Sequence, residues 1–233
     1  MMTQENEEVN KIREIYDDRK TLGIDYSPLN PSNYYILSSR EKMLNHFLNK
    51  YYQRTLPTIK IIDIGFGNGF DIFNLVKYGA TVRNIYGTEI IKERYEKVKY
   101  ALTDTNLRMV ENFILPYPNG LFDLVIQSTV LSSIQHEESR KKLASEMLRL
   151  LKKGGKVFSY DMRYPNPFNK DTLAIDKKEL KNLFEGGKFL DIKATTFNPV
   201  LTRKIAPSSI LLCQMLEKFP FLSSHYYSVI EKV

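Results

Sequence analysis

The sequence predicts an α/β protein in which helices cover both faces of a mostly parallel sheet. From residue 59 onward, apolar segments of strand length alternate with amphipathic segments of helical spacing, which is the pattern of a parallel sheet. Segment 122–130 is apolar enough to be buried on both faces, as such a sheet requires. The chain has 233 residues, 42% of them hydrophobic, with no internal repeat or linker, so we expect one domain with a full core.

The elements follow in order along the chain. Residues 1–55 have helical spacing without a strand pattern, and two prolines interrupt them within 26–35. Strands are predicted where apolar runs have strand length, at 59–64, 84–90, 107–113, 122–130, 156–163, 189–197 and 225–233. Helices are predicted between them at 71–80, 91–102, 138–151 and 177–187, and all but the second are bounded by glycine. A helical insert is expected near 206–222, before the last strand.

The turn after the first strand is the most informative part of the sequence. The strand ends near Asp63, and three glycines follow at alternate positions, Gly65, Gly67 and Gly69. Glycine is favoured where a backbone turns sharply or approaches a ligand closely, and a strand, a glycine turn and a helix build a nucleotide pocket in α/β sheets. The spacing G-x-G-x-G differs from the dinucleotide fingerprint, and a carboxylate before it would repel a pyrophosphate.

Two further acids follow the next predicted strands. Glu89 lies where a carboxylate usually accepts the hydroxyls of a ribose, and Glu111 with Asn112 suits the amino group of an adenine. Together with Asp63 they fit S-adenosylmethionine, which has an adenine, a ribose, an ammonium group and a sulfonium but no phosphate. The alternatives are that Asp63 caps the turn and that Glu89 begins the helix after it.

On these motifs the chain resembles the class I S-adenosylmethionine-dependent methyltransferases. The resemblance rests on IIDIGFGNG, YGTEI, VENFILPYPNGLFDLVI and EMLRLLKKGGKVFSYD, and covers roughly residues 55–165. It implies a Rossmann-like seven-stranded sheet whose last strand is antiparallel, within a domain of residues 56–233. It also implies cofactor contacts at Asp63, Gly65, Phe66, Gly67, Asn68, Gly69, Glu89, Ile90, Glu111, Asn112, Gln127 and Ser128.

The acceptor side is expected around the ends of the fourth and fifth strands. Tyr160, Asp161 and His136 are candidate catalytic groups, because a hydroxyl acceptor must lose a proton. Arg163 and Arg203, with the neighbouring Lys204, could hold an anionic acceptor such as a phosphate or a sugar nucleotide. Residues 1–55 are expected to pack over this site, where Tyr26 and Arg19, beside Tyr16, close over the cofactor or pack on the core. The alternatives are a surface position for His136 and a solvated loop for 201–204.

Composition limits the remaining function classes. The formal net charge of +7 leaves RNA methylation open as an alternative, but the lysines are spread along the chain and mixed with acids. No apolar run is long enough to span a membrane, and the polar N-terminal residues do not resemble a signal peptide, so a cytoplasmic location is expected. Cys213 is expected to be a buried, inert thiol, and no cluster of Cys and His suggests a metal.

The leading prediction is therefore methyl transfer to a small molecule or a glycan precursor. Segments QSTVLSSI, YDMRYPNPFN and LTRKIAPSSILLCQMLEKFPFLSSHYY resemble bacterial members associated with surface-polysaccharide biosynthesis. An RNA methyltransferase and a non-catalytic module that binds the cofactor remain alternatives. A nicotinamide oxidoreductase is disfavoured by Asp63.

Overall fold

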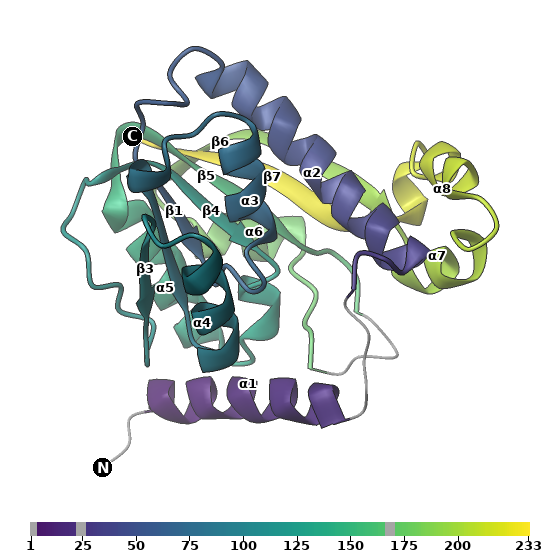
Figure 1. Ribbon diagram of the computed structural model, residues 1–233, viewed down its shortest axis with the longest axis horizontal. Helices are drawn as coiled ribbons and strands as arrows, with labels where there is room; N and C mark the ends of the chain where they lie inside the picture. The colour runs from purple at the N-terminus through teal and green to yellow at the C-terminus, as the bar shows by residue number, and fades with distance from the viewer. Residues whose placement is uncertain (1–3, 22–26, 166–170) are drawn as a thin grey trace.

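A computed structural model describes residues 4–21, 27–165 and 171–233 of the chain. Its centre is a seven-stranded sheet of order β3-β2-β1-β4-β5-β7-β6 (Figure 1). The strands are β1 (Ile61–Ile64), β2 (Ile85–Glu89), β3 (Asn106–Met109), β4 (Phe122–Ser128), β5 (Leu151–Met162), β6 (Gly187–Phe197) and β7 (Ser223–Lys232).

The sheet is parallel except where β7 enters it. β7 lies between β5 and β6 and is antiparallel to both, whereas the pairs from β3 through β5 are all parallel. The predicted fold class, a mostly parallel Rossmann-like sheet with an antiparallel last strand, is confirmed. In this register Asp63 of β1 lies between Gly87 and Ile126, so the glycine turn leaves the sheet at its centre.

Helices cover both faces of the sheet. On one face, α2 (Pro31–Tyr52), α3 (Phe70–Lys77) and α4 (Lys92–Ala101) share an apolar cluster with alternate residues of the central strands. On the other face, α1 (Gln4–Thr21), α5 (Glu137–Leu150) and α6 (Lys177–Leu183) contribute to a second cluster. Figure 1 shows that α1 runs along the lower margin of the molecule. It crosses the carboxyl ends of the parallel strands, where it contacts Ile90 after β2 and Gln135 after β4.

Three of the differences from the predicted element boundaries concern the site or the insert. β3 ends at Met109, so Glu111 and Asn112 lie in the loop after it. β5 begins at Leu151 instead of 156, because Leu151 pairs with Phe122 and the strand runs through Gly154 and Gly155. The insert begins at Pro199 instead of 206.

The insert forms a separate lobe beside the sheet (Figure 1). It consists of α7 (Pro199–Ile205), α8 (Ile210–Leu216) and a short 3-10 turn at Pro220–Leu222. Asn198 starts α7, since its side chain accepts hydrogen bonds from the amides of Val200 and Leu201. Among the residues that the structure describes, no helix has both the length and the apolar character to cross a membrane.

Candidate active site

The glycine turn at the end of β1 has the backbone conformation that its sequence predicts. Gly65, Gly67 and Gly69 all have positive φ, with values of 64°, 56° and 78°. A Cβ atom on Gly65 would lie 2.7 Å from Cγ2 of Val130, in the loop after β4. Glycine at position 65 therefore serves both the turn and the close approach of the neighbouring loop.

Glu89 at the end of β2 fixes this turn. Its Oε2 accepts a hydrogen bond from the Gly67 amide at 2.7 Å, and its Oε1 accepts from the amides of Ile90 and Ile91 at 2.7 and 2.9 Å. A carboxylate has about four acceptor positions, so three backbone donors leave capacity for a ligand hydroxyl. The buried Glu89 thus joins the glycine turn to the start of α4.

Asp63 is a buried carboxylate whose Oδ2 lacks a hydrogen-bond partner in the described part of the chain. Burial, with a contribution from the nearby Asp71, raises its pKa well above the ordinary value, and the positive charge of Arg40 opposes this. An unpartnered buried acid is costly, so it indicates a ligand position. The charge that would relieve Asp63 is positive.

A chain of polar contacts links this region to the end of β4. Ser128 donates a hydrogen bond to Oδ2 of Asp71 at 2.8 Å, and Nε of Arg40 lies 3.4 Å from Oδ1 of Asp71. Arg40 comes from α2 and stacks over Phe70 at the start of α3. Ser128, a predicted cofactor residue, therefore lies on the same face of the sheet as Asp63.

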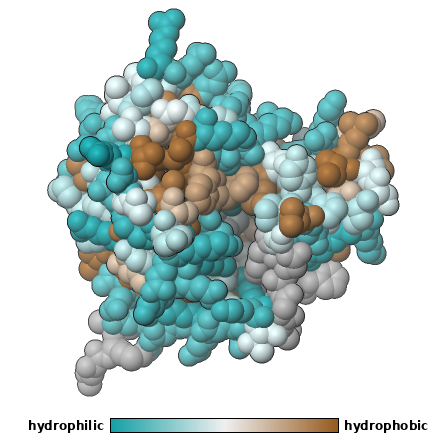
Figure 2. Space-filling view, viewed as in Figure 1, coloured by the Kyte–Doolittle hydropathy of each residue, from teal (hydrophilic) through white to brown (hydrophobic). Residues whose placement is uncertain are grey.

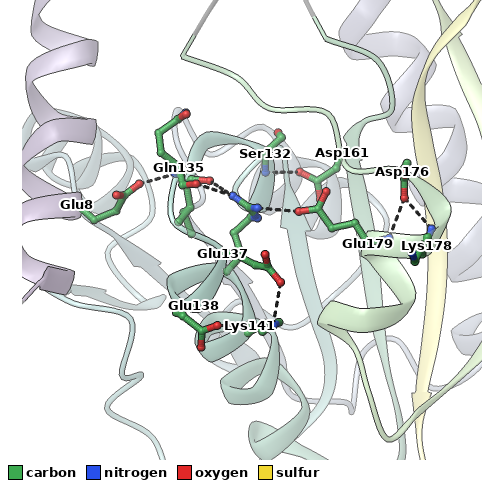
Figure 3. A network of polar contacts seen from close by, with 12 residues as sticks. Glu8, Ser132, Gln135, Glu137, Glu138, Lys141, Asp161, Asp176, Lys178 and Glu179 are labelled. Atoms are coloured by element: carbon green, nitrogen blue, oxygen red, sulfur yellow. Dashed lines mark hydrogen bonds and ion pairs between the residues drawn. The ribbon is translucent and has the colours of Figure 1, made fainter.

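Gln127 and Asp161 lie together on the opposite face. Oδ2 of Asp161 accepts hydrogen bonds from the amide of the Gln127 side chain and from the Ser159 hydroxyl. Its Oδ1 accepts a hydrogen bond from the Ser132 amide at 3.0 Å (Figure 3). Burial raises the pKa of Asp161 to about 6, and these hydrogen bonds oppose the shift. Both carboxylate oxygens of Asp161 have partners. Asp161 and Gln127 therefore fix the loop after β4, by accepting hydrogen bonds from the Ser132 and Val130 amides.

Tyr160 faces the side of Asp63 and Ser128. Its ring stacks on His225 of β7, with centroids 4.5 Å apart, and its hydroxyl lies 2.6 Å from Oγ1 of Thr196. Burial, followed by the charge of Arg40, lowers the pKa of His225 to about 3, so the imidazole is neutral at physiological pH. Its Nδ1 is paired with the Ser224 hydroxyl at 2.8 Å.

His225 was not among the predicted site residues. The strand containing it was placed correctly, but its position beside β5 depends on the antiparallel entry of β7 into the sheet. One sequence signal does point to it. His225 begins the predicted last strand, and the family resemblance implies that this strand is antiparallel.

The predicted cofactor residues outside the turn are more scattered. Phe66 is buried and packs against Gly87, while Asn68 is exposed. Glu111 is exposed in the loop after β3, and Asn112 accepts a hydrogen bond from the Ile114 amide at 2.9 Å. Ile90 is half-buried, and its carbonyl accepts a hydrogen bond from Arg13 of α1 at 3.0 Å.

Helix α1 is attached to the loops at the carboxyl ends of the parallel strands. Glu8 is buried and accepts a hydrogen bond from the Gln135 amide at 2.5 Å (Figure 3). Its Oε2 lies 3.2 Å from Nε2 of His136. At the other end of α1, the Tyr16 ring lies between the guanidinium groups of Arg19 and Arg94. The predicted catalytic residue His136 thus contacts α1, and the predicted substrate residue Arg19 lies 3.5 Å from Asp171.

The other predicted substrate residues are divided between two places. Arg163 donates to the Pro220 carbonyl at 2.8 Å and stacks over Tyr164 and Tyr226, so it joins β5 to the insert lobe. Arg203 is exposed on α7. Tyr26 lies outside the described residues.

Comparisons with known proteins find similarity to methyltransferases. Residues 62–159 match a family model described as a methyltransferase domain. A curated protein of Schizosaccharomyces pombe, tRNA (carboxymethyluridine(34)-5-O)-methyltransferase, is 28% identical over 139 residues. The match covers 55% of this chain and 57% of that protein, so the chain spans little more than half the length of this curated relative.

Solved structures share the fold at low sequence identity. The PH0226 protein from Pyrococcus horikoshii OT3 has a TM-score of 0.62 and 17% identity, covering 89% of this chain and 95% of that one. Geranyl diphosphate C-methyltransferase from Streptomyces coelicolor A3(2), solved with S-adenosyl-L-homocysteine, has a TM-score of 0.61 and 14% identity, covering 82% and 77%. The [4+2]-cyclase SpnF has the same TM-score and identity, covering 82% and 81%, so the fold alone does not specify a reaction.

Proposed function

We propose that this protein, whose residues 62–159 match a methyltransferase domain, transfers the methyl group of S-adenosylmethionine to a small acceptor. One observation carries the proposal. The buried acids Asp63, Asp71 and Glu89 gather at the turn, while the charge of Arg40 acts on Asp63 and pairs with Asp71. A ligand with an ammonium, a sulfonium and no phosphate fits this imbalance of charge.

The residues present fit this cofactor. The unpartnered oxygen of Asp63 suits the ammonium group of the cofactor, and the free acceptor capacity of Glu89 suits its ribose hydroxyls. The glycine turn leaves room for the cofactor to lie close to the protein backbone. When bound, the cofactor supplies an activated methyl group. The remaining tasks of the chain are to position the acceptor and to exclude water.

We infer that the acceptor atom arrives without a proton to lose, as a neutral amine or an ionised oxygen. Among the described candidates for a general base, both oxygens of Asp161 already accept hydrogen bonds. The Tyr160 hydroxyl is hydrogen-bonded to Thr196, and burial raises its pKa above the ordinary value for tyrosine. His225 is a weak base, because its pKa is lowered to about 3. It can still accept a hydrogen bond that orients the acceptor. An acceptor series should therefore show rate–pH profiles that follow the pKa of each acceptor, and one pKa common to the whole series would contradict this.

The acceptor that we favour is a small molecule or a glycan precursor of surface-polysaccharide biosynthesis. This choice is supported by the segments after the fourth strand and around the insert. They resemble bacterial methyltransferases that are associated with surface-polysaccharide biosynthesis. RNA is the second candidate, favoured by the curated relative and by the net charge of +7. Against it, many basic side chains are paired with acids, including Lys77 with Glu41, Lys152 with Asp123 and Lys156 with Glu231.

Calorimetric titration with S-adenosylmethionine and S-adenosylhomocysteine tests the proposal. We expect both to bind, and Glu89→Gln to weaken binding about 10–100-fold, the loss of one or two hydrogen bonds to a charged group. Glu93→Gln, an exposed change in the first turn of α4, is the matched control and should bind normally. Binding of NAD in place of both compounds would overturn the proposal.

A second assay separates the two acceptor classes. Release of S-adenosylhomocysteine should depend on added small molecules, with at most weak RNA binding. Tight RNA binding with a steep dependence on salt would transfer the proposal to RNA. Cofactor binding with no turnover on any acceptor would identify a binding module instead.

A further inference from the structure

Helix α8 consists almost entirely of apolar residues, although only part of its surface is buried. Its sequence, ILLCQML, contains a single polar residue, Gln214. The inner face carries Cys213, which is buried with Tyr35 and Phe197 in a cluster of the insert lobe. On the outer face, Leu211 is 67% exposed and Met215 is 54% exposed. A helix that is apolar all round is normally covered on every side, so this outer face calls for a partner.

The exposed apolar line continues beyond the helix. Leu211 and Met215 are four residues apart and lie in one row on α8, and Phe219 follows in the turn after the helix. Phe219 is 51% exposed and Phe221 is 72% exposed, with their ring centroids 5.9 Å apart. Figure 2 shows hydrophobic side chains gathered on this protruding lobe. We call the outer side chains of Leu211, Leu212, Met215, Phe219 and Phe221 the α8 surface.

The charges of the lobe are sorted by sign between inside and outside. Its only acid between 199 and 222, Glu217, accepts hydrogen bonds from the Ser39 and Thr195 hydroxyls at 2.7 and 3.0 Å and points inward. Arg203, Lys204 and Lys218 are all exposed. The outside of the lobe therefore combines apolar side chains with positive charge alone.

We propose that the α8 surface docks the protein onto a bilayer that contains anionic phospholipid. Apolar side chains of this kind enter the boundary between head groups and acyl chains, and flanking Lys and Arg are attracted to anionic head groups. A second copy of the chain fits less well. A two-fold contact between two lobes would pair surfaces that carry positive charge and no exposed acid within residues 199–222, which is unfavourable.

Vesicle flotation of the full chain tests the proposal. We expect binding to vesicles of phosphatidylcholine with phosphatidylglycerol, weaker binding to phosphatidylcholine alone, and a decrease as salt rises. The variant Leu211→Ser, Met215→Ser, Phe219→Ser should bind at least tenfold less. The variant Arg203→Gln, Lys204→Gln, Lys218→Gln should lose the preference for anionic vesicles.

Matched controls alter the same chemistry elsewhere. Tyr100→Ser with Ile114→Ser removes exposed apolar groups outside the lobe, and Lys97→Gln, Lys178→Gln, Lys181→Gln removes the same charge, so both should bind as the wild type does. If the triple serine variant does not fold, the single changes Leu211→Ser and Phe221→Ser replace it. Absence of wild-type binding to anionic vesicles, or equal loss in controls and variants, would overturn the proposal. So would a dimer, seen by light scattering, that the serine variant dissociates.

Discussion

At the scale of single residues, the glycine turn illustrates how one missing side chain serves two purposes. Gly65 has a positive φ, and a Cβ there would lie 2.7 Å from Val130. Gly79 also has a positive φ, of 96°, but a Cβ there would meet nothing within 4 Å. The two positions share the conformational requirement and differ in the close approach.

This difference makes a testable pair of substitutions. Gly79→Ala should lower the free energy of unfolding by about 1 kcal/mol, the cost of placing alanine at positive φ. Gly65→Ala should cost about 1–3 kcal/mol more, because the loop after β4 must move. Urea denaturation measures both, and equal losses in the two variants would show that the Val130 contact is not limiting.

His225 provides the prediction for pH. The unfolded chain takes up a proton on this imidazole near pH 6.5, whereas burial and Arg40 lower the folded pKa to about 3. The contribution of His225 to stability is therefore complete above about pH 6.5 and decreases as the pH falls toward about 3, by about 1.4 kcal/mol per pH unit. His225→Gln should remove this slope in urea denaturation at pH 4–6. His46→Gln, an exposed change on α2, should retain it, and identical slopes in all three proteins would contradict the assignment.

Single residues also show where sequence reasoning reached its limit. Asp63 and the glycines were predicted from a local pattern, and their burial and positive φ values agree with it. The face on which a strand residue points, and what lies opposite, depends on non-local pairing. Asp161 and Tyr160 are neighbours in the sequence, yet they lie on opposite faces, and only Tyr160 shares the face of Asp63. Whether any of these residues contacts cofactor or acceptor stays a prediction.

At the scale of elements, α1 is held by a buried acid as well as by apolar packing. Val9 and Ile12 are buried in the cluster on the α5 face. The neighbouring Glu8 accepts a hydrogen bond from the Gln135 amide in the loop after β4. Glu8→Ala would leave the Gln135 amide without its acceptor, at a cost of about 1–3 kcal/mol.

The expected result is local opening of α1. Amide hydrogen exchange in residues 4–21 should become about 5–100-fold faster in Glu8→Ala, with the sheet unchanged. Glu7→Ala changes an exposed acid on the same helix and should exchange as the wild type does. Uniform acceleration throughout the protein would instead indicate global destabilisation.

Elements with strong local signals were predicted well, and those that depend on pairing were not. The helices within 1–55, the strands β1, β2, β4 and β7, and α5 lie within a few residues of their predicted positions. β5 starts earlier because Gly154 and Gly155, interpreted as a helix stop, lie inside the strand. α7 was missed although Asn198 followed by Pro199 is a helix-start signal, because the segment LTRK was weighed only as a loop or a ligand site.

At the scale of the whole molecule, cofactor binding should stabilise the fold. S-adenosylhomocysteine at about one hundred times its dissociation constant should add about 2.7 kcal/mol to the free energy of unfolding. For a chain of this size the melting temperature should rise by about 5–10 °C. NAD serves as the control, because Asp63 disfavours its pyrophosphate. A thermal scan with no shift from S-adenosylhomocysteine, or an equal shift from NAD, would contradict the proposed cofactor.

The position of β7 has a consequence for how the protein is made. Among the described residues, β6 has only β7 as a neighbour in the sheet, and β7 is the last of the seven strands to be synthesised. While the nascent chain lacks residues 223–232, β5 exposes an unpaired edge and β6 cannot join the sheet at all. At about 5–20 residues per second, the ribosome takes several seconds to produce the segment between β5 and β7. During those seconds the open edge can pair with other chains, so binding of a chaperone would protect the nascent protein most at this stage of synthesis.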